Sequence, residues 1–120
     1  MIHLVLATVL SLNHNSWLLQ SMNGQAVTAH RPTLTFDAAH SRAYGSAGCN
    51  RFTGGYTQRG WRLRFTEVAL TRMACIDEAQ HVEDAFTIVL NNTRSWKILD
   101  GRLILYDALG RRLARFIPEE

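Results

Sequence analysis

The chain has 120 residues, of which 47% are hydrophobic and 19% are charged, and its formal net charge is +3 at pH 7. This length suits one small domain, and the proportion of apolar residues excludes an intrinsically disordered protein. Almost all of the basic residues are arginine, so the charge would favour an anionic partner only where these arginines cluster.

Residues 1–15 form an N-terminal segment with an almost wholly apolar run at residues 2–12. The run is too short to cross a bilayer as a helix. Its length is typical of the apolar part of a signal peptide, but the segment lacks a basic start, an Ala-x-Ala cleavage site and a cysteine for lipid attachment. Two interpretations stay open: an atypical or trimmed export signal, and a structured element that packs on the core. No later segment predicts a transmembrane helix.

Short strands predominate from residue 16 onward. Asn23-Gly24 lies between two short apolar runs in residues 17–27 and predicts a hairpin. Apolar and polar residues then alternate in residues 33–37, which predicts a half-buried strand, with residues 42–48 as its partner.

The clearest alternation is in residues 61–66. Trp61, Leu63 and Phe65 are expected to face one way, and the intervening residues, which include Arg62 and Arg64, to face the other way. Residues 68–73 are expected to form a further strand.

The periodicity changes at residue 77. In DEAQHVEDAFTIVLNN the apolar residues recur at helical spacing and form one stripe, which consists of Val82, Ala85, Phe86, Val89 and Leu90. Asp77 is the expected N-cap, and Asn91-Asn92 is the expected end of the helix. The adjacent carboxylates Glu83 and Asp84 point in different directions on a helix, so we expect a solvated face and not an acid/base pair.

The C-terminal part returns to strands. Asp100-Gly101 between alternating apolar residues predicts a two-residue hairpin, and Leu109-Gly110 turns the chain into a last strand. The sum is eight or nine short strands and one helix. The expected fold is therefore mainly β with one α-helix, in a small antiparallel sheet that is strongly curved or closed to hide its edges.

Cys49 and Cys75 are the only cysteines. Two cysteines cannot build a structural zinc site alone, and no Cys-x-x-Cys or His-x-x-x-His spacing adds ligands, so neither a metal nor another cofactor is expected. A catalytic cysteine needs a base, and no histidine, His81 included, sits in a motif that pairs it with either cysteine. In an exported protein a disulfide would be the simplest use of the pair, whereas in the cytosol both would be buried free thiols.

Five arginines form a candidate surface for an anion or a partner. Arg62 and Arg64 share one face of a strand, and Arg111, Arg112 and Arg115 lie near the C-terminus. The five would make one basic patch if their strands were neighbours. Aromatic residues do not interleave with them, so no nucleic acid is expected as a partner.

Two motifs stand in a specific order and spacing: Gly48-Cys49-Asn50-Arg51-Phe52 and Thr71-Arg72-Met73-Ala74-Cys75. With the Trp17-Leu18-Leu19 stretch before them and the hairpin of residues 96–106 after them, they resemble the META domain family of HslJ-like proteins. The resemblance covers about residues 16–117, and we expect the domain to span residues 16–118.

This resemblance implies a lipocalin-like or barrel-like antiparallel domain with one helix, in the periplasm or outer envelope of a bacterium, often as a lipoprotein. HslJ-like proteins are linked to the heat response and to novobiocin resistance, and no enzymatic activity is established for the family. In that setting we expect a Cys49–Cys75 disulfide. The residues around it form a structural signature in which Asn50 and Arg51 tie down neighbouring loops by hydrogen bonds; its other members are Gly48, Phe52, Thr71, Arg72 and Met73.

The leading hypothesis is therefore a non-enzymatic, monomeric, envelope-associated stress-tolerance protein that binds an envelope protein or a small ligand. The alternative is a small-molecule carrier with a barrel-like cavity, and a third hypothesis is a cysteine-dependent enzyme that uses Cys49 or His81. A core filled by side chains would argue against the carrier. A bond between the two cysteines would argue against the enzyme.

Overall fold

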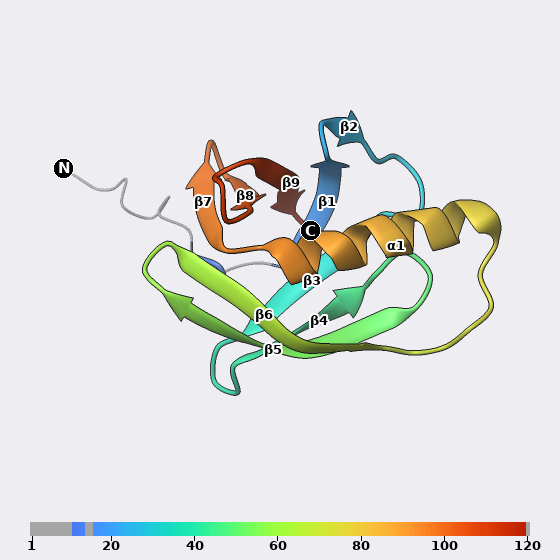
Figure 1. The fold of residues 1–120 in the computed structure, drawn as a ribbon, viewed down its shortest axis with the longest axis horizontal. Coiled ribbons are helices and arrows are strands. Elements are labelled where there is room, and N and C mark those ends of the chain that lie inside the picture. The colour runs from blue at the N-terminus through green and yellow to red at the C-terminus, as the bar shows by residue number, and fades with distance from the viewer. Residues whose placement is uncertain (1–10, 14–15, 120) are drawn as a thin grey trace.

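The computed structural model describes residues 11–13 and 16–119 (Figure 1). Within these residues the elements are, in chain order, β1 (Trp17–Met22), β2 (Gln25–Ala26), β3 (Thr33–Asp37), β4 (Arg42–Ser46), β5 (Arg51–Arg59), β6 (Arg62–Leu70), α1 (Asp77–Asn92), β7 (Ser95–Leu99), β8 (Arg102–Tyr106) and β9 (Arg112–Pro118). The mainly β fold with one helix is therefore as the sequence predicts.

The strands form one antiparallel sheet in the order β2-β1-β3-β4-β5-β6-β7-β8-β9. The sheet also closes on itself, because β1 pairs with β9 from Trp17 opposite Pro118 to Met22 opposite Ala114. Closure hides the edges that a small open sheet would expose. This ring of strands confirms the expected strongly curved, closed arrangement.

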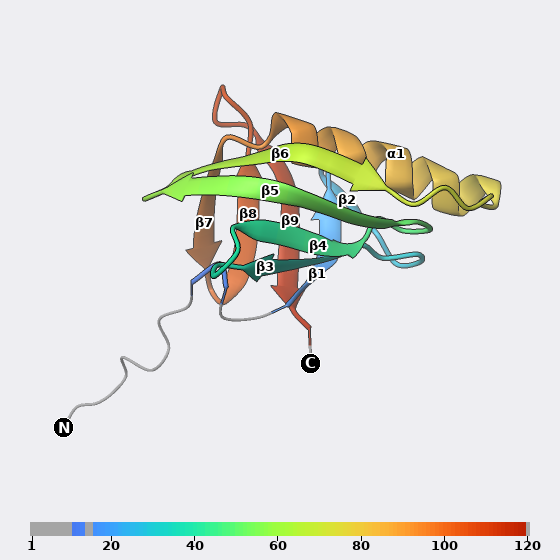
Figure 2. The ribbon, with the colours of Figure 1, turned by 90° about the horizontal axis from the view of Figure 1, so that it is seen from below.

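The ring is weakest between β6 and β7, which share a single residue pair, Arg62 opposite Ser95. Beyond this pair the two strands diverge, and α1 packs along β6, as Figure 2 shows. Phe86 of α1 is fully buried, and its ring lies 5.7 Å from that of Phe52 on β5 and 6.2 Å from that of Phe116 on β9. The helix therefore fills the space that the diverging strands would leave open.

Both two-residue hairpins form where the sequence predicts them. Asn23 and Gly24 have φ values of 53° and 80°, and Asp100 and Gly101 have φ values of 53° and 75°. Two consecutive positive φ angles match the twist of the flanking strands, and Asn-Gly and Asp-Gly adopt them at low cost. Local turn chemistry thus fixes the register of β1 with β2 and of β7 with β8.

Side chains fill the interior of the ring. Phe36 packs edge-on against Tyr56 at 5.0 Å between ring centroids and stacks on Phe65 at 5.9 Å. Trp17 is fully buried, and its indole N–H donates to the carbonyl of Leu12, which is itself buried in the core.

The two interpretations of residues 1–15, an export signal and an element packed on the core, fall largely outside the described residues, which include only residues 11–13 of this segment. In the part that the structure describes, no helix is long and apolar enough to cross a membrane.

Three local predictions are wrong. Trp61 does not face the core with Leu63 and Phe65 but is 70% exposed, because it lies in the turn before β6, where strand alternation does not apply. The expected strand at residues 68–73 is instead the end of β6 followed by an irregular segment at residues 71–76. The N-cap position is Ile76 and not Asp77, which is the first helical residue.

Candidate functional site

The Gly48-Cys49-Asn50 motif forms a tight corner between β4 and β5, pressed against α1. Gly48 has φ +121°, a conformation that residues with a side chain rarely adopt. A Cβ at this position would also lie 3.1 Å from Cγ1 of Val82 and 3.4 Å from the main-chain nitrogen of Glu83. Glycine therefore lets the corner approach the helix closely enough for Asn50 to reach Glu83.

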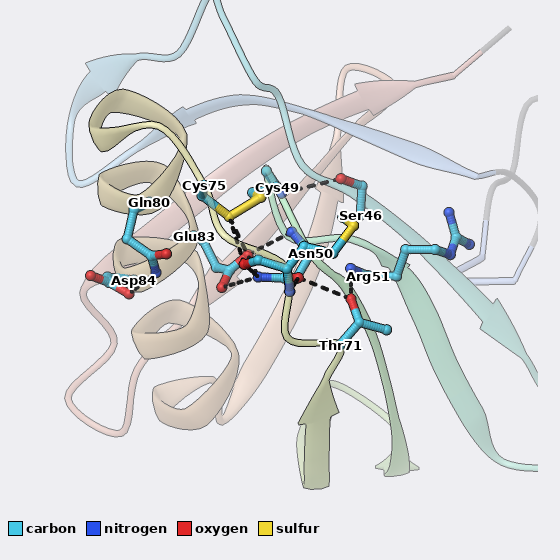
Figure 3. The surroundings of a disulfide bond; sticks show 11 residues. Ser46, Cys49, Asn50, Arg51, Thr71, Cys75, Gln80, Glu83 and Asp84 are labelled. Carbon is cyan, nitrogen blue, oxygen red and sulfur yellow. Dashed lines mark hydrogen bonds between the residues drawn. A yellow bond between two sulfur atoms is a disulfide. The ribbon is translucent and has the colours of Figure 1, made fainter.

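Glu83 accepts two hydrogen bonds from Asn50. The main-chain N–H of Asn50 donates to Oε1 at 2.7 Å, and its side-chain amide donates to Oε2 at 3.1 Å (Figure 3). Glu83 is 6% exposed and Asn50 is 3% exposed. The sequence predicts that Glu83 lies on a solvated helix face, and that prediction is wrong, because the carboxylate is buried and held by hydrogen bonds.

The same asparagine holds the irregular segment at residues 71–76. Its Oδ1 accepts the main-chain N–H of Met73 at 2.6 Å and the hydroxyl of Thr71 at 3.1 Å. Thr71 Oγ1 in turn accepts the main-chain N–H of Arg51 at 3.0 Å. Asn50 thus links the corner, the helix and residues 71–76, as expected for a residue that ties down loops.

A disulfide between Cys49 and Cys75 joins two of these segments, the corner before β5 and residues 71–76. The two Cα atoms lie 6.0 Å apart. This pairing is the one expected from the sequence for an exported protein. The two sulfurs and a carboxylate oxygen of Glu83 lie within 4.8 Å of one another, which is a spacing suited to a metal ion. Metal ligation by cysteine needs thiolates, however, and sulfurs bonded to each other do not supply them. We name the set of Cys49, Cys75, Asn50, Thr71 and Glu83 the disulfide cluster.

The remaining signature residues divide between core and surface. Phe52 is buried, whereas the side chains of Arg51, Arg72 and Met73 are exposed. Arg51 bonds to Thr71 through its main chain, but its guanidinium makes no hydrogen bond or ion pair within the described residues, and Figure 3 shows it pointing away from the disulfide cluster. The expectation that Arg51 ties down a loop therefore holds for its main chain only.

The structure separates the two groups of candidate arginines. Arg62 and Arg64 share the exposed face of β6, whereas Arg112 and Arg115 belong to β9, and β7 and β8 lie between these strands. Arg115 is half-buried, and Arg112 is exposed.

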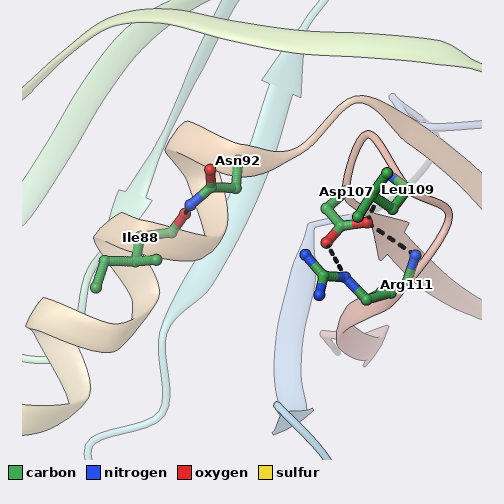
Figure 4. Close-up of polar contacts among 5 residues, drawn as sticks. All are labelled: Ile88, Asn92, Asp107, Leu109 and Arg111. Atoms are coloured by element: carbon green, nitrogen blue, oxygen red, sulfur yellow. Dashed lines mark hydrogen bonds and ion pairs between the residues drawn. The ribbon is translucent and has the colours of Figure 1, made fainter.

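Arg111 is held in the turn before β9. Its guanidinium pairs with Asp107 at 2.8 Å, and Asp107 also accepts the main-chain N–H groups of Arg111 and Leu109 (Figure 4). The hydrogen bond from the main chain of Arg111, together with that from its side chain, lowers the pKa of Asp107 below its ordinary value. In the same figure, the amide of Asn92 donates to the carbonyl of Ile88 and closes the last turn of α1.

A concave region lies around the start of β6, and the sequence indicates only part of it. It has a volume of about 580 Å³ and its lining includes Arg59, Arg62, Arg64 and Arg94 together with the exposed ring of Trp61. Arg59 and Arg94 were missed because they come from other elements, and only strand pairing brings them to Arg62. Glu83 was also missed, although its spacing from the buried residues Ala79, Phe86 and Leu90 is helical.

Comparison with known proteins gives matches over most of the chain. Residues 10–120 match the family model described as the META domain. A protein solved by NMR is 26% identical, with a TM-score of 0.67 over 87% of this chain and 89% of that chain. An NMR structure of a protein from Burkholderia xenovorans is 25% identical, with a TM-score of 0.69 over 90% of this chain and 83% of that chain.

A crystal structure of a DUF4847 family protein from Bacteroides vulgatus shares the fold, with a TM-score of 0.65 at 13% identity over 91% of this chain and 96% of that chain. No curated protein matches the chain.

Proposed function

Because the chain belongs to the META domain family, we propose that it is a non-enzymatic, envelope-associated protein of the HslJ-like type, which supports stress tolerance by binding another protein or a small ligand. The observation that carries this proposal is the disulfide between Cys49 and Cys75. Disulfides persist in oxidising compartments such as the periplasm and are rare in the cytosol.

The disulfide also bears on the competing enzyme hypothesis. A nucleophilic cysteine acts as a thiolate, and neither Cys49 nor Cys75 has a free sulfur in this structure. His81, the other residue of that hypothesis, is an exposed residue of α1. A structural role for the two cysteines therefore supports binding rather than catalysis as the function of this domain.

The filled interior bears on the carrier hypothesis. Small-molecule carriers of the lipocalin type hold their ligand inside the ring of strands. Here Trp17, Phe36, Phe65, Phe86 and Phe116 are all buried in one continuous core inside the ring. We therefore favour a surface of the domain, and not its interior, as the place where the ligand or partner binds.

The first experiment tests the location. Cells that express the chain are separated into envelope and cytosolic fractions, and the protein is alkylated under denaturing conditions before and after reduction. We expect envelope protein in which both thiols become reactive only after reduction. Cytosolic protein with two freely alkylated thiols would contradict the proposal.

The second experiment tests the role in stress tolerance. A strain that lacks the gene is compared with its parent for growth at elevated temperature and in the presence of novobiocin. We expect the deletion to lower tolerance, and the wild-type gene to restore it. A deletion strain that grows like its parent under both conditions would contradict this part of the proposal.

A further inference from the structure

The concave region at the start of β6 is rich in arginine. The tip of the β5–β6 hairpin forms one side of it, the start of β7 and the turn at residues 107–110 form the other, and Figures 1 and 2 both show the hairpin tip beside β7. We name this region the arginine groove; its cationic residues are Arg59, Arg62, Arg64 and Arg94.

Strand register crowds positive charge on one face of the hairpin. Arg59 lies directly opposite Arg62, and Arg64 follows Arg62 on the same exposed face. Like charges directly opposite each other across two strands destabilise a sheet. Within the described residues, none of these three guanidinium groups makes an ion pair or a side-chain hydrogen bond. The fold thus holds three cations together without neutralising them.

The other charged groups of the groove are already engaged. Arg94 donates to the main-chain carbonyls of Asn91 and Thr93, at 3.1 Å and 2.7 Å, which fixes its position. Asp107 is the carboxylate in the lining, and it pairs with Arg111. It is therefore not available to neutralise Arg62 or Arg64. An anion from solution would find the positive field of the groove uncompensated.

Trp61 presents a rigid apolar surface beside these charges. Trp61 is 70% exposed, but its main-chain carbonyl accepts the main-chain N–H of Trp96 at 2.9 Å. The indole of Trp96 also donates to the carbonyl of Gly60 at 2.9 Å. The turn is thus fixed while the ring stays in solvent. Exposed tryptophans of this kind are typical of binding hot spots.

We propose that the arginine groove binds a phosphate ester whose flat or apolar portion packs on Trp61. Phosphate is favoured over carboxylate, because a phosphate ester offers three terminal oxygens and about −1.5 to −2 charge to several guanidinium groups, whereas a carboxylate offers two oxygens and a single charge. The groove volume of about 580 Å³ is in the range of small-ligand sites. This inference rests on the proposed function, since it takes the protein to act by binding, and it names the class of ligand.

The phosphate can belong to a soluble molecule or to a lipid headgroup, and two probes distinguish these sources. The first is naphthyl phosphate, titrated against the purified, oxidised protein by calorimetry. The second is a vesicle of phosphatidylcholine that contains phosphatidic acid, compared in a sedimentation assay with a vesicle of phosphatidylcholine alone. Binding of naphthyl phosphate indicates a soluble ligand, and binding of the phosphatidic acid vesicle alone indicates a lipid.

Three variants test whether the groove is the site. Combining Arg62→Gln with Arg64→Gln should weaken binding of the responsive probe by at least about tenfold, since it removes two charge-assisted contacts. The matched control is Arg112→Gln, an exposed arginine of β9 outside the groove, which should leave the affinity unchanged. Trp61→Ala should weaken binding of naphthyl phosphate while leaving that of inorganic phosphate unchanged.

Loss of folding is not expected to obscure this result, because removing a cation opposite Arg59 relieves repulsion and should not lower the melting temperature. The inference is overturned if neither probe binds, or if the double variant binds as well as the wild type. If the wild-type protein binds neither probe but its gene still restores stress tolerance, the inference about phosphate binding is refuted and the proposed function stands. A cytosolic protein with free thiols that still binds naphthyl phosphate would refute the proposed function alone.

Discussion

Replacing Glu83 by glutamine should destabilise the disulfide cluster. The change replaces one carboxylate oxygen by an amide nitrogen and leaves the other heavy atoms as they are. The carboxylate accepts two hydrogen bonds from Asn50, one from its main chain and one from its side chain. Glutamine offers one acceptor and one N–H₂ group, so one of the two donors of Asn50 loses its acceptor. Rotating the amide of Asn50 does not help, because its nitrogen would then face the N–H of Met73, which now donates to Oδ1 at 2.6 Å.

The free energy of unfolding should fall by about 2–4 kcal/mol. Two hydrogen bonds to a charged group contribute about 1.5–3 kcal/mol each, whereas the variant keeps one neutral bond of about 1 kcal/mol. A buried donor without a partner costs about another 1–3 kcal/mol. Glutamine carries no charge, so the variant avoids part of the free-energy cost of burying the carboxylate. The net loss of stability is therefore smaller than the sum of these contributions.

The assay is urea unfolding of the oxidised protein, with Asp84→Asn as the control. Asp84 neighbours Glu83 on α1 and undergoes the same chemical change, but it is exposed, and among the described residues it accepts a hydrogen bond only from the side-chain amide of Gln80. The control should therefore change the free energy of unfolding by no more than about 0.5 kcal/mol. Equal stability of Glu83→Gln and the wild type, or an equal loss in both variants, would refute the reasoning.

Three further predictions concern the disulfide, a close contact and the response to acid. Replacing Cys49 and Cys75 together by alanine should lower the free energy of unfolding by about 3.5 kcal/mol, which is the chain-entropy value for a separation of 26 residues, and a reductant should then have no further effect on the urea midpoint. Gly45→Ala should cost about 3 kcal/mol in the same assay, because a Cβ there would overlap the main-chain carbonyl of Thr33 on the neighbouring strand, and an unchanged midpoint would contradict this close approach. Asp107→Asn should be less stable than the wild type at neutral pH. Because the folded pKa of Asp107 is lowered from 3.8, this difference should shrink as the pH falls through that lowered value, and a difference that stays constant down to strong acid would contradict the pairing with Arg111.

The parts of the fold that the sequence predicts are those fixed by neighbouring residues. The Asn23-Gly24 and Asp100-Gly101 turns need positive φ angles at consecutive residues, which these dipeptides favour, so both hairpins could be located. The helical stripe around Phe86 repeats every three to four residues and could be read in the same way. The strand alternation does not hold for Trp61, because this residue lies in the turn before β6, outside the paired residues of the strand.

The candidate sites depended on partners that are distant in the sequence. A carboxylate such as that of Glu83 is normally solvated, and its burial became favourable only because Asn50, 33 positions away, supplies two donors. The pairing of Arg62 with Ser95 brings Arg94 to the β5–β6 hairpin, and no local pattern indicates this pairing. The cysteine pair was the exception, since two cysteines allow only one intramolecular disulfide.

The pairing of β1 with β9 also determines when the fold can be completed. Trp17 has Pro118 as its partner, so the ring stays open until β9, near the end of the described chain, is available to pair. Joining segments so far apart carries a large loop-closure entropy, and such contacts form slowly. Until then β1 presents unpaired main-chain groups along the edge that β9 will cover, and a nascent chain with such an edge is prone to aggregate. Pairing of the seven-residue strand β9 with β1 therefore completes the ring and removes this exposed edge.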